Sequence, residues 1–491
     1  MSIWKRKPLA LLLAEASETE KGLKRTLTAW SLVALGIGAI IGAGLFVRTA
    51  TAAAQNAGPS VTIGFIVAAI GCALAGLCYA ELSSSIPISG SAYTYTYATM
   101  GELLAWIIGW DLILEYAVGA ATVGIAWSEY LNNLLVNVLH VSPIPYEWCH
   151  SPFQHSTDGV SGIINFPAFF IVAVISLLLI KGTQESAFVN GIIVVAKVAI
   201  VVMIIIFGWH FINPANHTPY IPQASTFIDD QGVGHHFGGI MGILGAAGTV
   251  FFAFIGFDAV STAAQETINP KRNMPIGILG SLAICTVLYI LFAHVLTGIA
   301  TVDDFRTGGK EASVAFAIGK YMIGYKWLAD FVTIAILAGF SSVILVMLLG
   351  QSRVFYSMGK DGLLPKIFSE VHTKYKTPYK ANLAILVIVG AFAAFIPGDI
   401  VGDMTSIGTL FAFILVCISV IVLRKTEPDM KREFKTPFVP LVPILGIIVC
   451  LAMIYGLGWT NWLRLIVWLA IGLVVYFVYS KKNSRLNNPE D

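Results

Sequence analysis

The chain has 491 residues, of which 57% are hydrophobic and 12% charged, and its formal net charge is +2. A mean hydropathy of +0.79 excludes an ordinary soluble protein, since soluble domains carry roughly twice this share of charged residues. The small net charge gives no indication of a nucleic-acid partner. Membrane lipid is therefore the expected surrounding of most of the chain.

Apolar stretches recur along the whole sequence, and roughly 20 residues of helix are enough to cross the hydrocarbon core. We predict an all-α integral membrane protein with twelve transmembrane helices. A cytoplasmic segment, 1–26, precedes them, and a cytoplasmic tail, 480–491, follows. The predicted spans are 27–53, 61–82, 103–128, 163–180, 187–209, 240–264, 276–300, 327–349, 381–396, 407–423, 439–456 and 461–479.

Lysine and arginine give the orientation, because cytoplasmic loops hold an excess of both. With the N-terminus inside, most of the 30 basic residues fall on the cytoplasmic side. We therefore expect a multi-pass protein of the cell membrane with both termini in the cytoplasm. The cysteines and histidines show no spacing typical of a disulfide framework or a metal site, and no cofactor is expected.

The first span is unusually rich in glycine. Gly36, Gly38, Gly42 and Gly44 occupy four of nine positions, and each weakens a helix interior by about 1 kcal/mol relative to alanine. Span six has a matching irregularity, where Gly256 and Asp258 interrupt an apolar run.

Matched interruptions indicate an inverted-repeat transporter with its site at the breaks. Spans one to five, 27–209, would form the first repeat, and spans six to ten, 240–423, the second. Spans eleven and twelve, 439–479, would lie outside the repeat.

An unwound backbone inside a membrane is tolerated where it is buried or lines a cavity, and an amino acid could supply its missing partners. The substrate carboxylate would accept from the N–H groups of Ala43 and Gly44 at a half-helix N-terminus. Its ammonium would donate to exposed carbonyls of the two breaks. The candidate binding residues are Ile40, Ile41, Gly42, Ala43, Gly44, Glu115, Phe252, Ala253, Phe254 and Ile255.

Each feature has a simpler interpretation. Gly38-xxx-Gly42 is also an ordinary helix-packing motif, and the paired break in span six is what favours a site. Lys197 lies within span five, where an ammonium costs at least about 2.5 kcal/mol and usually marks a pathway, although it could also reach the inner surface. It is the candidate for binding and releasing a proton.

Further polar residues lie within predicted spans. Asp111 and Glu115 are one turn apart in span three, and Glu115 could face a cationic substrate side chain or serve packing. Asp258 could cap the second half of span six or bind a proton. Ser341 and Ser342 could offer hydroxyls to a cation or bond their own helix.

The sequence resembles the amino acid, polyamine and organocation transporter superfamily, and within it the cationic amino acid transporter family. The resemblance runs nearly end to end. Its motifs are Gly38 to Phe46 (GAIIGAGLF), Gly109 to Tyr116 (GWDLILEY), Phe254 to Asp258 (FIGFD), Glu266, Asn269 to Arg272 (NPKR), Gln351 to Arg353 (QSR) and Asp361 to Pro365 (DGLLP).

The resemblance implies a five-plus-five inverted-repeat fold that holds the substrate backbone between spans one and six. It also implies that Lys197 replaces the sodium ion of sodium-coupled relatives, facing the carbonyls of Gly38 and Ile41 with Ser341 and Ser342 nearby. Vertebrate members of the cationic family have two further spans, so this chain resembles the bacterial type. Relatives of that type take small neutral as well as cationic amino acids.

The resulting hypothesis is a proton-coupled importer of cationic or small neutral L-amino acids that works by alternating access, and not an enzyme. The alternatives are sodium-coupled transport, amino acid exchange, or a sensor that binds amino acids without moving them. The expected partners are a free amino acid, H⁺ and membrane lipid.

Overall fold

The computed structural model describes residues 3–9, 11–12, 27–88, 91–156, 158–181, 187–228, 232, 234–307, 313–372, 375 and 377–487. The predicted N-terminal segment, 1–26, lies largely outside these ranges, as do the end of the tail and the side chain of Glu266. Eight helical stretches of the described chain are long and apolar enough to cross a membrane, and four shorter apolar helices accompany them. This confirms an all-α membrane protein.

The described part of the first half of the chain is mostly helical. Between its helices, the longer loops of the described residues lie at 86–88 and within 139–165. Thr28 caps the first helix, where its hydroxyl accepts from the N–H of Ser31 at 3.3 Å. The elements are α2 (Ala29–Ile40), η1 (Gly44–Arg48), α3 (Thr49–Ala52), η2 (Ala53–Ala57), η3 (Gly58–Ser60), α4 (Val61–Ser85), α5 (Ser91–Thr99), α6 (Glu102–Leu112), η4 (Ile113–Val118), α7 (Gly119–Asn133), η5 (Leu134–Val138), η6 (Tyr146–Trp148), α8 (Phe166–Lys181) and α9 (Ala187–Gly208).

The second half begins with two short 3₁₀ helices and a two-stranded hairpin and is otherwise mostly helical. Its elements are η7 (Trp209–Phe211), η8 (Pro214–His217), β1 (Ser225–Ile228), β2 (Gly234–Phe237), α10 (Gly239–Phe251), η9 (Phe252–Phe254), η10 (Asp258–Glu266), α11 (Pro270–Ile299), α12 (Val302–Thr307), α13 (Ser313–Tyr321), α14 (Lys326–Lys360), η11 (Lys366–Phe368), α15 (Tyr379–Phe395), α16 (Gly398–Thr426), α17 (Leu441–Gly456), α18 (Trp459–Val475), η12 (Tyr476–Ser480) and α19 (Lys481–Asn483).

The structure differs from the predicted spans at several ends. α14 continues eleven residues past the predicted boundary at 349, because Gly350 and the polar residues that follow remain helical beyond the apolar window. α11 begins at Pro270, six residues earlier than predicted, since proline is well suited to the first turn of a helix. The antiparallel β1–β2 hairpin in the loop before α10 was not predicted.

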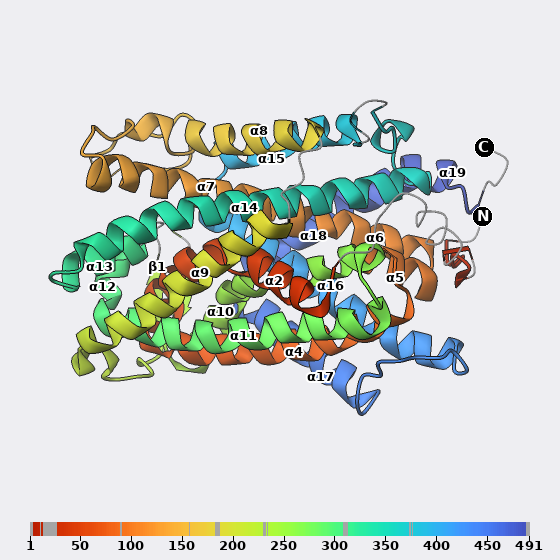
Figure 1. Ribbon diagram of the computed structural model, residues 1–491, viewed down its shortest axis with the longest axis horizontal. Helices are drawn as coiled ribbons and strands as arrows, with labels where there is room; N and C mark the ends of the chain where they lie inside the picture. The colour runs from red at the N-terminus through yellow and green to blue at the C-terminus, as the bar shows by residue number, and fades with distance from the viewer. Residues whose placement is uncertain are drawn as a thin grey trace.

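The helices run side by side along the long axis of the molecule (Figure 1). α4 packs along α11 on one side, and α8 packs along α15 on the other. α2 and α10 lie between these layers, where α2 contacts α11, α9 and α14, and α10 contacts α4 and α17. The two interrupted helices are therefore inside the bundle, with protein rather than lipid around their breaks.

The described parts of both termini meet at one end of the bundle. The Lys5 ammonium donates to the carbonyl of Leu486 at 2.5 Å, and the Lys7 ammonium pairs with Asp361 at 2.8 Å. Figure 1 shows the N and C labels at this same end. The described residues nearest the two termini thus lie at the same end of the bundle.

Candidate functional site

The first break lies where the glycine pattern predicted it. α2 ends at Ile40, and Ile41 is extended with φ −73° and ψ 104°. The chain then re-enters a helix at η1, where the N–H of Leu45 donates to the carbonyl of Gly42 at 3.1 Å. In the described part of the chain, the N–H groups of Gly42, Ala43 and Gly44 donate to no carbonyl. They form an open half-helix N-terminus, which attracts anions.

The second break follows α10. The helix tightens into the 3₁₀ turn η9, Ile255 is extended with ψ 133°, and Gly256 has φ +116°. Only glycine adopts that backbone conformation at little cost, which explains the residue at this point. The chain then continues as the 3₁₀ helix η10, which begins at Asp258.

The two breaks touch each other through their glycines. A Cβ atom on Gly44 would lie 2.2 Å from the Cα of Ala253, and one on Gly256 would lie 2.9 Å from the carbonyl carbon of Ala39. Each break therefore presses directly on the backbone of the other interrupted helix. This reciprocal contact brings the predicted residues of both breaks into one place.

Tyr289, in the middle of α11, ties the two breaks together. Its hydroxyl lies 2.9 Å from the carbonyl oxygen of Ile40 and 2.9 Å from that of Ala253. One hydroxyl proton can serve only one of them at a time, so each carbonyl keeps some capacity to accept. Sequence reasoning missed this residue; a lone tyrosine in an otherwise apolar helix is the signal that could have found it.

Tyr289 also changes the predicted ammonium site. Ile40 and Ala253 already have a partner in Tyr289, and the Phe252 carbonyl accepts from the N–H of Ile255 at 3.3 Å. Among the predicted acceptors, the carbonyl of Ile255 receives no hydrogen bond from the described residues. Phe254 serves packing, since its ring lies 5.3 Å from that of Tyr289 between centroids.

We expect Tyr289→Phe to lower the apparent Tm of the purified protein. The substitution leaves two buried carbonyls without their shared donor, and such a loss costs about 1–3 kcal/mol. Tyr79→Phe is the matched control, because Tyr79 is also fully buried but its hydroxyl bonds to no described residue. Thermal unfolding of both variants in the same detergent checks the prediction, and equal Tm values for the two would contradict it.

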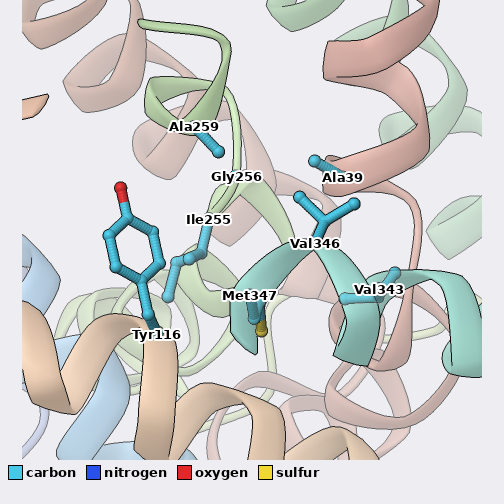
Figure 2. Close-up of a pocket in the computed structure, with 8 residues that line it drawn as sticks. All are labelled: Ala39, Tyr116, Ile255, Gly256, Ala259, Val343, Val346 and Met347. Atoms are coloured by element: carbon cyan, nitrogen blue, oxygen red, sulfur yellow. The ribbon is translucent and has the colours of Figure 1, made fainter. Parts of the chain in front are cut away.

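A small cavity opens beside the second break (Figure 2). Its wall combines the end of α2, the turn after η9, one face of α14 and the ring of Tyr116 from η4. Apart from the Tyr116 hydroxyl, which points away toward the turn near Ala259, the lining side chains are apolar. The lining residues are Ala39, Tyr116, Ile255, Gly256, Ala259, Val343, Val346 and Met347.

Lys197 reaches the broken end of α2 from α9. Its ammonium donates to the carbonyl of Gly38 at 2.8 Å, and its side chain is 3% exposed. A Cβ on Gly339 of α14 would lie 2.9 Å from the Lys197 Cε, so the lysine stem lies against that glycine. The structure therefore brings Lys197, α2 and α14 together, as the resemblance implied.

The two serines near this lysine differ in their hydrogen bonds. Ser341 donates to the carbonyl of Leu337 in its own helix at 3.0 Å, which is the simpler of its two predicted roles. The hydroxyl of Ser342 is buried and bonds to no described residue. No described contact joins Lys197 to the carbonyl of Ile41.

Glu115 is fully buried in η4, a turn with i→i+5 hydrogen bonds, but it is not among the residues that line the cavity. Tyr116, the next residue, provides that wall and donates its hydroxyl proton to Asp258 at 2.5 Å. Asp111 is buried too, and neither of its oxygens is bonded within the described chain.

Comparison with known proteins places the chain in a family. The sequence profile of the family described as "Amino acid permease" matches residues 27–484. A branched-chain amino acid permease of Bacillus subtilis is 44% identical over 99% of both chains, and a methylthioribose transporter of the same organism is 41% identical over 99% of both. A vacuolar cationic amino acid transporter of Arabidopsis thaliana is 27% identical over 95% of this chain and 93% of its own.

These matches confirm the predicted superfamily, although the bacterial branched-chain permease is more similar than the plant cationic transporter. The family and these relatives are transporters and not enzymes. The chain belongs to the amino acid permease family.

Proposed function

We propose that the protein is a secondary active transporter that imports amino acids by alternating access around the two breaks. The observation that carries this proposal is the reciprocal contact of the breaks, where three N–H groups of the first break donate to no described carbonyl and a small cavity adjoins the second. A substrate carboxylate fits the open N–H groups of Ala43 and Gly44. The substrate ammonium would donate to the carbonyl of Ile255 and to the carbonyls of Ile40 and Ala253, which share the single hydroxyl proton of Tyr289.

The apolar wall of the cavity supports the proposal that the substrate carries a neutral aliphatic side chain. Ile255, Val343, Val346 and Met347 offer methyl and thioether groups and no charge, and apolar walls favour apolar ligands. The similarity to a branched-chain amino acid permease agrees with this assignment. A cationic side chain, the class named for the Arabidopsis relative, would need a carboxylate such as Glu115 to reach the cavity. The relative that carries methylthioribose makes that compound a necessary member of any substrate panel.

The architecture we propose has twelve spans, formed by the eight long helical stretches and four shorter apolar helices. Spans one to five (27–209) and six to ten (240–423) form inverted repeats, and spans eleven and twelve (439–479) follow. The breaks at Ile41 and Gly256 occupy corresponding places in the two repeats, which supports this division. The shared end of the two termini supports a cytoplasmic location for both.

Proton coupling is the proposed energy source, with Lys197 as the proton carrier. A protonated Lys197 donates to Gly38 at the broken end of α2, and a neutral one would hold this helix less firmly. Loss of the proton would thus loosen α2 against α9, the kind of movement that alternating access requires. In sodium-coupled transport, the sodium ion would instead bind at the carbonyls of the broken end of α2 and the hydroxyl of Ser342.

We expect vesicles that contain the purified protein to accumulate leucine or isoleucine when the outside is more acidic than the inside. Replacement of sodium by choline should leave this uptake unchanged, because in the proposed mechanism the ammonium of Lys197 takes the role of a coupling sodium ion. A competition panel of the twenty amino acids and methylthioribose should show the strongest inhibition by aliphatic amino acids.

Vesicles that contain no protein provide the control for leakage. Uptake into vesicles without internal amino acid separates net transport from exchange, and radiolabelled leucine bound without net flux would identify a sensor. Strong inhibition by arginine or methylthioribose with none by leucine would contradict the proposed substrate class. Dependence on sodium would contradict the proposed coupling.

A further inference from the structure

Glu115 and Asp258 form a carboxyl pair that the proposed transport mechanism does not use. Both side chains are fully buried and lie within hydrogen-bonding reach of each other. The Tyr116 hydroxyl donates to one oxygen of Asp258 at 2.5 Å. In the described part of the chain, no other side chain donates to Asp258 or to either oxygen of Glu115, and the backbone N–H groups of Gly256 and Asp258 lie beside the Asp258 carboxyl.

Two other buried glutamates show how this fold supplies buried carboxyl groups with hydrogen-bond donors. Glu81 accepts from the Arg424 guanidinium at 2.7 and 2.8 Å and from the N–H of Thr436 at 2.7 Å. Glu102 accepts from Tyr97 at 3.1 Å and from Tyr476 at 3.0 Å. An isolated buried carboxylate costs several kcal/mol, and donors or cations offset that cost. Glu115 has no such support.

The groups that face the pair are acidic or phenolic. They are Tyr79 on α4, Tyr95 on α5, Asp111 on α6 and Tyr116 on η4 itself. Arg353 of α14 donates to the carbonyl and hydroxyl oxygens of Thr262, four residues beyond Asp258, at 3.4 and 3.3 Å. Among the described residues no lysine, arginine or histidine pairs with Glu115 or Asp258. A proton is the cation that fits between them.

We propose that Glu115 and Asp258 together bind one exchangeable proton, which the Glu115 carboxylic acid donates to the Asp258 carboxylate. Asp258 then accepts from the hydroxyl groups of Tyr116 and Glu115. The pair carries one negative charge in this state. When the proton leaves to water, two facing carboxylates remain and repel each other. The pair is separate from Lys197, and Tyr116 links it to the cavity wall.

Tyr116 connects this proton site to the cavity, because its ring forms part of the wall and its hydroxyl holds Asp258 (Figure 2). Glu115 sits in an i→i+5 turn, a feature that occurs often at functional sites, and Asp258 begins the 3₁₀ helix that follows the second break. Protonation of the pair would therefore change the charge directly behind the cavity wall. The proposal concerns the empty protein and does not depend on the substrate or on coupling.

Infrared difference spectroscopy of the purified protein in detergent, without substrate, tests the proposal. Wild-type protein should show a C=O stretching band of a protonated carboxylic acid that shifts in D₂O and disappears reversibly at alkaline pH. Glu115→Gln should lose this band. Asp258→Asn should keep a protonated-acid band at a shifted frequency, because the acceptor of the Glu115 proton changes from a carboxylate to an amide.

Two further variants make the assignment specific. Glu102→Gln is the matched control, since Glu102 is equally buried but well supplied with donors, and its spectrum should keep the band. Asp111→Asn identifies any separate contribution of Asp111. Absence of the band in the wild type, its survival in Glu115→Gln, or an unshifted band in Asp258→Asn would overturn the proposal. Circular dichroism of each variant shows whether it is folded.

Discussion

Gly44→Ala should reduce leucine binding and uptake by at least tenfold, a difference of about 1.4 kcal/mol. The added methyl group would lie 2.2 Å from the Cα of Ala253 and 2.5 Å from its nitrogen, and both are backbone atoms that cannot turn away. The two breaks must therefore separate, at a cost of roughly 1–3 kcal/mol for overpacking. Separation displaces the open N–H groups from the second break, where the substrate ammonium would bind.

Gly76→Ala is the control, because a Cβ there would meet only side-chain atoms at ordinary contact distances, the nearest in Leu282 at 3.4 Å. It adds the same methyl group to a neighbouring helix and should keep binding and uptake near the wild-type values. Scintillation proximity binding in detergent and initial uptake rates in vesicles measure the two effects separately. Wild-type affinity in Gly44→Ala would show that the contact between the breaks does not shape the site.

Much of the fold could be predicted from the sequence, because lipid allows few alternatives to the helix. Each predicted span has a helical counterpart in the structure, and the breaks at Gly42 and Gly256 lie where glycine interrupts apolar runs. Glycine is informative at these points because a positive φ and a close backbone approach both exclude a side chain. Lys197 could be identified for a similar reason, since a lysine inside a span needs a partner.

The contacts between distant segments could not be predicted. Nothing in the local sequence shows that Tyr289 would reach Ile40 and Ala253, which are 249 and 36 residues away. The orientation of the Glu115 side chain also could not be predicted from the sequence. Prediction assumed a regular helix, in which Asp111 and Glu115 share a face, whereas the i→i+5 turn from Ile113 rotates the side chains that follow. Tyr116 consequently occupies the cavity wall that was predicted for Glu115.

Lys197→Ala should abolish accumulation driven by an acidic exterior and remove the pH dependence of the uptake that remains. The substitution takes the donor away from the Gly38 carbonyl and leaves no group at this place to carry a proton. Lys197→Arg should also fail to accumulate substrate, because a guanidinium supplies the charge but does not release its proton at physiological pH. The two variants together separate a structural role of the cation from its titration.

The measurement is initial leucine uptake into vesicles over a range of external pH at constant internal pH. Lys181→Ala, at the exposed end of α8, removes one positive charge away from the breaks and should retain the wild-type profile. Counterflow, which needs no driving force, should persist in Lys197→Ala if the variant still binds substrate and changes conformation. Uptake by Lys197→Ala that still follows the external pH would show that the coupling proton binds elsewhere. The Glu115–Asp258 pair would then be the first place to test, because its partner Tyr116 lines the cavity.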